Sequence, residues 1–185
     1  MPVNASNSDL DWQAPDFNLI SVNEQYYSLS KLCGKNGTLI AFICNHCPYV
    51  IRIIERLVSE SIELKNIGVS TIAIMSNDVK QYPEDSYEKM KEFSLKYDFK
   101  FHYLYDSTQQ VAKDYKAVCT PDIFGFNKDL QLKYRGRIDS KVVENDNNDI
   151  KREMYEAMKL ITETNQGPIN QFNSFGCSIK WISNE

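Results

Sequence analysis

The feature that most constrains this fold is a junction between an apolar run and an amphipathic stretch. Residues 38–43 (TLIAFI) form a continuous apolar run, which is typical of a central strand covered on both faces. Residues 44–48 (CNHCP) follow, and apolar side chains then recur at helical spacing to about Lys65. Proline is favoured at the first helical position, where its missing N–H has no intrahelical partner anyway. We therefore expect Pro48 to begin a helix and Cys47 to lie at or beside its N-cap.

A thiol at a helix N-terminus is in an environment that favours ionisation. It meets unpaired backbone N–H groups and the positive end of the helix dipole. Such settings lower a cysteine pKa from near 8.5 to about 3.5–7.5. His46 precedes Cys47 directly and would lower its pKa further if protonated. The order of strand, Cys-x-x-Cys, proline and helix therefore predicts a redox motif with Cys47 as its thiolate and Cys44 as its partner.

Strand and helix signals alternate through the first half of the chain, and a hairpin followed by a helix closes the second half. This order predicts an α/β sandwich with a mixed central β-sheet flanked by helices. We expect a polar N-terminal arm over residues 1–16, one domain over 17–162 and a C-terminal tail over 163–185 that packs on the domain. Two capping boxes are predicted, at residues 85–88 and 106–109.

Composition excludes several classes of protein. The 185 residues include 21 Lys and Arg against 25 Asp and Glu, a net charge of −4, and no basic cluster indicates a nucleic-acid partner. The longest apolar run, residues 39–44, is too short to span a bilayer. The first residues have neither the basic nor the apolar segment of a signal peptide, so we expect a cytoplasmic protein. Its five cysteines are an odd number, so they cannot all pair within one chain.

The chain resembles the thioredoxin-like superfamily, and more closely the peroxiredoxin-like branch of the alkyl hydroperoxide reductase/thiol-specific antioxidant group. The resemblance implies a thioredoxin-like three-layer sandwich. It also implies that Pro121, which follows Thr120, is a cis-proline facing the active-site cysteine. The stretches that carry it lie at residues 14–17 (APDF), 42–50 (FICNHCPYV), 76–78 (SND), 105–106 (YD), 119–122 (CTPD), 134–137 (YRGR) and 176–181 (GCSIKW).

The sequence departs from the family pattern around the cysteines. When Phe42 is matched to the strand phenylalanine of a thioredoxin, Cys47 falls on the nucleophilic cysteine and Val50 on the resolving one. Peroxiredoxins carry a threonine three residues before the cysteine, and this chain has Cys44 there. The threonine that activates peroxide is therefore missing. Arg135 or Arg137 would be able to supply a cation, but no pattern in the sequence places either beside Cys47.

These residues predict a thiol-disulfide oxidoreductase or a peroxiredoxin-like antioxidant. The Cys47 thiolate would attack a disulfide, an oxidised thiol or a hydroperoxide, and a second cysteine would resolve the product. Cys44 is the preferred resolving residue and Cys119 the next, while Cys177 is able to arrive from the tail and Cys33 is the bystander. We expect His46, Pro48, Thr120 and Pro121 as active-site neighbours. No cofactor is expected, the reductant would be of thioredoxin or glutathione type, and the protein would be a monomer or dimer without a nucleic-acid or membrane partner.

Two alternatives belong to other classes. Cys44, His46 and Cys47 offer soft ligands that suit copper(I) or zinc. A non-catalytic redox sensor on a thioredoxin fold is the second alternative, because a fold does not determine a function.

Overall fold

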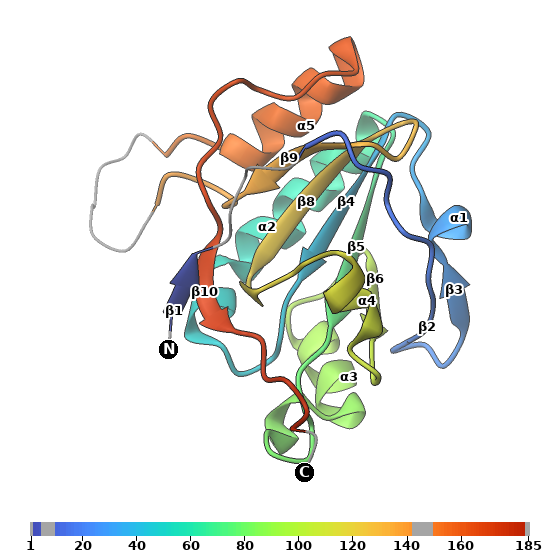
Figure 1. Ribbon diagram of the computed structural model, residues 1–185, viewed down its shortest axis with the longest axis vertical. Helices are drawn as coiled ribbons and strands as arrows, with labels where there is room; N and C mark the ends of the chain where they lie inside the picture. Colours follow the sequence, from blue (N-terminus) through green and yellow to red (C-terminus); the bar gives the residue numbers. More distant parts are fainter. Residues whose placement is uncertain (1, 5–9, 142–149, 184–185) are drawn as a thin grey trace.

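Figure 1 shows the computed structural model, which describes residues 2–4, 10–141 and 150–183. Within them a mixed sheet has the strand order β3-β2-β6-β5-β4-β8-β9. Its central strand β4 pairs parallel with β5 and antiparallel with β8, which confirms the predicted α/β class with a mixed sheet. The strands are β2 (Asn18–Ser21), β3 (Tyr26–Ser28), β4 (Gly37–Phe42), β5 (Val69–Met75), β6 (His102–Tyr105), β8 (Asp122–Asn127) and β9 (Leu132–Gly136).

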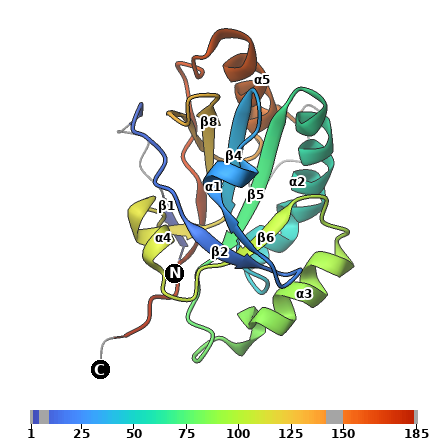
Figure 2. The same ribbon diagram turned by 90° about the vertical axis from the view of Figure 1, so that its right-hand side faces the viewer.

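Helices cover both faces of this sheet (Figure 2). Buried side chains of α2, α3 and α5 pack in one core cluster, and those of α1 and α4 pack in another on the opposite face. Within the described residues, no helix is both long and apolar enough to cross a lipid bilayer. The helices are α1 (Leu29–Leu32), α2 (Pro48–Asn66), α3 (Tyr87–Lys96), α4 (Gln110–Asp114) and α5 (Glu153–Thr164), and a single 3-10 turn, η1 (Pro83–Asp85), precedes α3.

Strand β4 is buried on both faces, as its apolar run predicts. Leu39, Ala41 and Ile43 point to the cluster beneath α2, whereas Ile40 and Phe42 point to the cluster beneath α4. Successive side chains of a strand point to opposite faces, so a strand covered on both sides needs apolar residues at every position. This burial fixes the end of β4, and therefore the start of the loop that carries the first cysteine of the motif.

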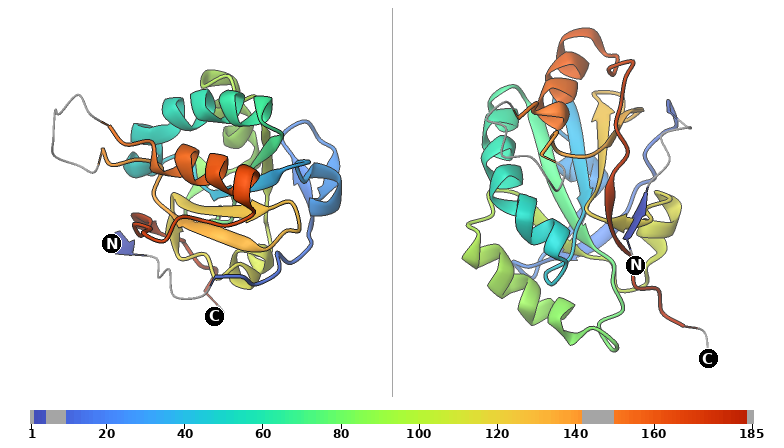
Figure 3. Two further views of the ribbon diagram at one scale, coloured as in Figure 1. Left: turned by 90° about the horizontal axis from the view of Figure 1, so that it is seen from above. Right: turned by 90° about the vertical axis from the view of Figure 1, so that its left-hand side faces the viewer.

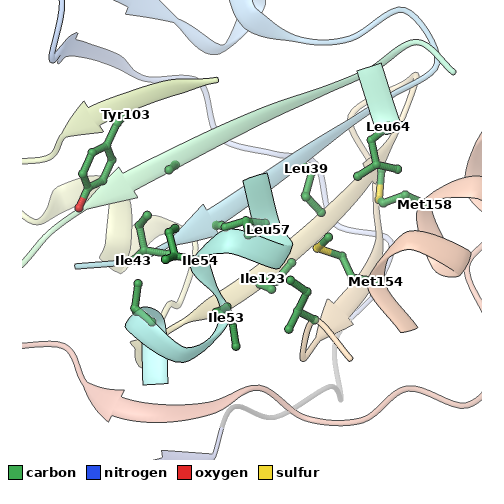
Figure 4. Packing of buried hydrophobic residues seen from close by; sticks show 14 of the residues in the cluster. Leu39, Ile43, Ile53, Ile54, Leu57, Leu64, Tyr103, Ile123, Met154 and Met158 are labelled. Atoms are coloured by element: carbon green, nitrogen blue, oxygen red, sulfur yellow. The ribbon is translucent and has the colours of Figure 1, made fainter. Parts of the chain in front are cut away.

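Helix α2 is held against the sheet by an apolar stripe at helical spacing. Ile54 and Leu57 are fully buried, so truncating either to alanine should cost about 2–5 kcal/mol. The helix ends before Gly68, whose φ of +80° is the left-handed conformation that glycine adopts readily. Figure 4 shows this packing for labelled residues Leu39, Ile43, Ile53, Ile54, Leu57, Leu64, Tyr103, Ile123, Met154 and Met158.

A second, smaller sheet lies at one side of the molecule (Figure 3). We call it the cover sheet: β1 (Pro2–Asn4), β10 (Phe175–Ser178) and β7 (Cys119–Thr120), in the order β1-β10-β7. The Thr120–Pro121 peptide bond, between β7 and β8, is cis, as the resemblance implies. Because Asp122 pairs with Phe42, this bond lies at the carboxyl end of β4, where the cysteine motif begins.

Several local expectations are wrong. Neither predicted capping box forms: Ser86 and Gln109 are the N-caps of α3 and α4, and neither makes a side-chain cap hydrogen bond. The carboxylate of Asp85 turns inward instead, and that of Asp106 accepts from the Ala112 N–H at 2.9 Å. The C-terminal tail contains a strand that the sequence patterns did not predict, β10, which forms because residues far apart in sequence supply its two neighbouring strands.

Candidate active site

The predicted nucleophile lies where the helix signal places it. Cys47 is the N-cap of α2, and Pro48 is the first helical residue. The Cys47 side chain is fully buried, with 0% of its surface exposed. Its Sγ lies 3.1 Å from the carbonyl oxygen of Thr120, so the protonated thiol donates a hydrogen bond there. The Cys47 sulfur therefore faces the cis-proline segment rather than solvent.

Hydrogen bonds to the Cys47 sulfur lower its pKa to about 5. The largest contribution comes from the Cys44 thiol, and the Cys177 side chain and the backbone N–H of Val50 add to it, against burial, which raises the pKa. The Thr120 carbonyl also acts against ionisation, because it accepts a hydrogen bond only from the protonated thiol. Since three groups donate to the sulfur, the thiolate is the favoured form at neutral pH.

Cys44 is the complementary member of the pair. It lies two residues beyond β4, is 1% exposed, and its Sγ is 3.3 Å from the hydroxyl oxygen of Thr120. The hydrogen bond to Cys47, burial and the charge of Asp85 raise the pKa of Cys44 well above its usual value. Of the two thiols, Cys47 is therefore the one that ionises first.

Cys119 is buried in β7 and makes a different set of contacts. Its thiol donates to the carbonyl oxygen of Pro121 at 3.4 Å. Burial and the nearby Asp122 carboxylate raise its pKa, and the charge of Cys47 adds to this shift. Cys119 is therefore near the site, but it is a protonated thiol that is bonded to a carbonyl.

Cys177 is the site residue to which sequence reasoning gave too little weight. It lies in β10 directly opposite Thr120, whose carbonyl oxygen is 3.1 Å from Cys47 Sγ. Burial and the hydrogen bond to Cys47 raise its pKa to about 11. Its position depends on pairing between residues 177 and 120, which no local pattern shows. The one sequence signal for Cys177 was that residues 176–181 (GCSIKW) are among the stretches that resemble the family. Cys33, the expected bystander, is exposed at the end of α1.

His46 is oriented by a buried carboxylate. Its Nδ1 lies 2.8 Å from Asp85 Oδ2, and its ring stacks on Tyr82 at 5.5 Å between centroids. Asp85 also accepts from the Asn45 N–H and from the Asn77 side chain, each at 2.8 Å. The Asp85 carboxylate raises the pKa of His46. Asp85 was expected only as a helix cap, but it organises the loop between the two cysteines.

One group of side chains could hold a metal ion. Ligand atoms of Cys44, His46 and Asp85 all lie within 4.8 Å of one another. The sequence predicted Cys44, His46 and Cys47 as metal ligands, whereas in the structure the third ligand of this group is Asp85. The Asp85 carboxylate already accepts two hydrogen bonds and faces His46, so a cation would have to compete with these contacts.

The two arginines weighed as cations for the site are engaged elsewhere. Arg135 donates to the buried Asp122 carboxylate at 2.8 Å, and its guanidinium lies over the Phe124 ring. Arg137 makes a two-pronged ion pair with Glu153 at 2.6 and 2.8 Å. The charges of both arginines are therefore compensated by their own carboxylates.

A cleft of about 490 Å³ opens beside the cis-proline. Its walls come from α2, the segment after β9 and the residues leading into β10, and they include Tyr49, Arg52, Pro121, Arg137, Asn173 and Phe175. Cys47 itself is covered, so the cleft borders the thiol site without exposing its sulfur.

The chain is similar to proteins of a known family. Residues 11–135 match the AhpC/TSA family. An uncharacterized conserved protein from Geobacillus kaustophilus superposes with a TM-score of 0.95 at 39% identity, over 100% of this chain and 98% of that one. A hypothetical protein from Sinorhizobium meliloti gives 0.91 at 30%, over 98% and 99%. Among curated proteins no match is found.

More distant structures show the fold alone. Peroxidoxin BcpB from Mycobacterium tuberculosis superposes with a TM-score of 0.56 at 16% identity, over 66% of this chain and 81% of that one. The predicted three-layer architecture is therefore the thioredoxin-like fold.

Proposed function

The chain belongs to the AhpC/TSA family, and we propose that it is a thiol-disulfide oxidoreductase whose attacking group is the Cys47 thiolate. One observation carries the proposal: Cys47 lies at the N-cap of α2 beside the cis-proline segment, where the neighbouring Cys44 and Cys177 lower its pKa to about 5. Thiolates attack disulfides and thiols do not, so a sulfur that is ionised near neutral pH is suited to this chemistry.

The reaction has two exchange steps. The Cys47 thiolate attacks one sulfur of a substrate disulfide, forms a mixed disulfide and releases the other substrate sulfur as a thiolate. Cys44 then attacks Cys47 Sγ, forms the Cys44–Cys47 disulfide and transfers its proton to the departing substrate thiolate. The negative charge on Cys47 disappears in the mixed disulfide. This removes the hydrogen bond that is the main cause of the raised pKa of Cys44. Formation of the intermediate thus activates the resolving thiol.

The contacts favour a disulfide over a hydroperoxide as the oxidant. The peroxiredoxin threonine position holds Cys44, and Arg135 and Arg137 pair with Asp122 and Glu153. A peroxide-reducing site stabilises the departing oxygen with donors of this kind, and here they are committed to other partners. A peroxiredoxin-like antioxidant role remains the rival within the same family.

Thiol trapping tests the proposed nucleophile. Reduced protein is treated with iodoacetamide at graded pH, and each cysteine is quantified by mass spectrometry. We expect Cys47 to alkylate faster than Cys33 near neutral pH, although Cys33 is exposed and Cys47 is buried. Equal or slower labelling of Cys47 overturns the proposal.

Steady-state assays then separate the two redox activities. Turnover of insulin or oxidised glutathione disulfide, with no rapid sulfenic acid on Cys47 after addition of hydrogen peroxide, supports the oxidoreductase. Rapid peroxide-driven sulfenic acid with no disulfide turnover supports the antioxidant role instead.

Metal binding is the second candidate function, because Cys44, His46 and Asp85 lie within ligand distance of one another. Neutral imidazole, thiolate and carboxylate form a ligand set that suits zinc. Zinc titration of the reduced protein, monitored with a competing chelator, tests this candidate. Stoichiometric binding that is lost in both Cys44→Ser and Asp85→Asn supports a metal site, whereas no binding removes it.

A further inference from the structure

The two sulfurs of the proposed exchange pair are covered by protein in the described structure. Cys47 is 0% exposed and Cys44 is 1% exposed. A disulfide between them would leave its two sulfurs at the same buried positions. An external thiol must contact a sulfur directly to reduce it, because exchange proceeds by in-line attack on that atom. Attack on the buried pair itself, like the attack of Cys47 on a substrate disulfide, requires the covering segment around Thr120 to open. A partly exposed thiol beside the pair would give an external thiol a target without that opening.

Cys177 is such a thiol. It is half-buried, and it lies in β10 opposite Thr120, whose carbonyl oxygen is 3.1 Å from Cys47 Sγ. Its side chain packs against the core cluster that contains Cys44 and Cys47. Four thiols lie around Thr120, and of these Cys177 is partly exposed whereas Cys44, Cys47 and Cys119 are buried.

Neighbouring residues hold the Cys177 strand close to the Thr120 backbone. A Cβ atom on Gly176 would lie 2.1 Å from the carbonyl oxygen of Thr120, so only glycine permits this approach of β10 to the cis-proline segment. Beyond the strand, the Lys180 N–H donates to the Asn77 side chain at 2.9 Å and the Lys180 carbonyl accepts from the Asp78 N–H at 2.8 Å. The position of Cys177 is thus fixed from both sides.

We propose that Cys177 is a third catalytic thiol, which relays electrons between external thiols and the buried Cys44–Cys47 pair. The inference rests on the proposed function and adds the route by which the enzyme is re-reduced. The external reductant belongs to the class of thiols represented by glutathione.

The relay has three balanced exchange steps. Cys177 attacks Cys47 Sγ of the Cys44–Cys47 disulfide, and its proton passes to the departing Cys44. An external thiolate then attacks Cys177 Sγ, forms a mixed disulfide and releases Cys47 as a thiolate. A second external thiolate attacks the external sulfur of that mixed disulfide, so Cys177 leaves and takes a proton from solvent. Two external thiols become one disulfide, and the enzyme gains two electrons. Cys47 suits the second step because a thiol of low pKa leaves readily.

The first experiment is disulfide mapping of Cys44→Ser after addition of one equivalent of oxidised glutathione. We expect a Cys47–Cys177 disulfide to accumulate, identified by mass spectrometry of the linked peptides. A Cys47–glutathione adduct that never pairs with Cys177 overturns the relay but leaves Cys47 as the nucleophile. Absence of any modification at Cys47 overturns both the relay and the proposed function.

The second experiment measures reduction of the Cys44–Cys47 disulfide by reduced glutathione. We expect this step to slow by at least about tenfold in Cys177→Ser and in Cys177→Ala, because the external thiol loses its accessible target. Cys33→Ser, which removes the exposed thiol at the end of α1, is the control and should keep the wild-type rate. Circular dichroism checks that each variant is folded. Wild-type reduction rates in folded Cys177 variants contradict the relay.

Discussion

The N-terminus of α2 and strand β7 each hold a fully buried thiol, and the two thiols behave in opposite ways. Cys47 has a pKa lowered to about 5, whereas burial raises the pKa of Cys119. Both lie beside the same cis-proline segment, and both sulfurs contact a carbonyl oxygen of it. Burial is therefore not what separates them. The neighbouring Cys44 and Cys177 lower the pKa of Cys47. The charge of Asp122 instead raises the pKa of Cys119 beyond the effect of burial.

The largest expected effect is the loss of the thiol at the end of α2. Cys47→Ser should reduce turnover of oxidised glutathione by at least about 100-fold, because a serine hydroxyl is not ionised at neutral pH and does not form disulfides. The measurement is the steady-state rate with a thioredoxin- or glutathione-type reductant. Activity within tenfold of wild type contradicts the assignment of Cys47.

The pH dependence of labelling tests the difference in pKa directly. The thiolate fraction of Cys47 falls as pH drops through about 5, so its alkylation rate should be level above about pH 6 and fall tenfold per unit well below 5. Cys44→Ala removes the main donor and should move this profile to higher pH, whereas Cys44→Ser keeps a hydroxyl donor and should move it less. A plateau reached only above pH 8 in the wild type contradicts the lowered pKa.

Gly176→Ala should separate β10 from β7. The added Cβ meets the Thr120 backbone, so the strand must shift, at a cost of about 1–3 kcal/mol in unfolding free energy. We expect faster alkylation of Cys47 together with a lower midpoint in urea. If both quantities are unchanged, β10 does not control access to the thiol.

Asp85→Asn should alter the loop between the cysteines more than the thiols themselves. Because Asp85 raises the pKa of His46, the neutral amide should let that pKa fall toward its usual value. Weaker hydrogen bonds to Asn45 and Asn77 should cost about 1–3 kcal/mol. Titration of the His46 ring protons by nuclear magnetic resonance measures the first effect, and urea unfolding the second. An unshifted His46 titration contradicts the ion pair.

The smallest expected effect is that of Cys119→Ser. The side chain keeps a donor for the Pro121 carbonyl, and resolution through Cys44 does not use Cys119, so turnover should stay within about threefold of wild type. A loss comparable with that of Cys44→Ser would show that Cys119 resolves the mixed disulfide and would make the two regions functionally similar.

Most of the fold could be predicted from local sequence patterns. The apolar run in β4, the proline at the start of α2 and the glycine after it each determine their own backbone conformation, so they are readable without the rest of the chain. Cys47 was found for the same reason. Asp85 was misread because its sequence context fits a cap equally well, and only the folded loop shows which N–H groups it meets. Cys177 depends on pairing between residues more than fifty positions apart.

The position of the cover sheet also has a consequence during synthesis. Strand β7 pairs with β10, which is formed by residues 175–178, so this pairing requires the C-terminal segment. All strands of the central sheet, in contrast, lie before residue 137. Chains are made from the N-terminus, and early parts fold first. A nascent chain would therefore hold Cys47 without β10 beside it until residues 175–178 have left the ribosome. The order of translation itself makes the shielding of this sulfur a late event.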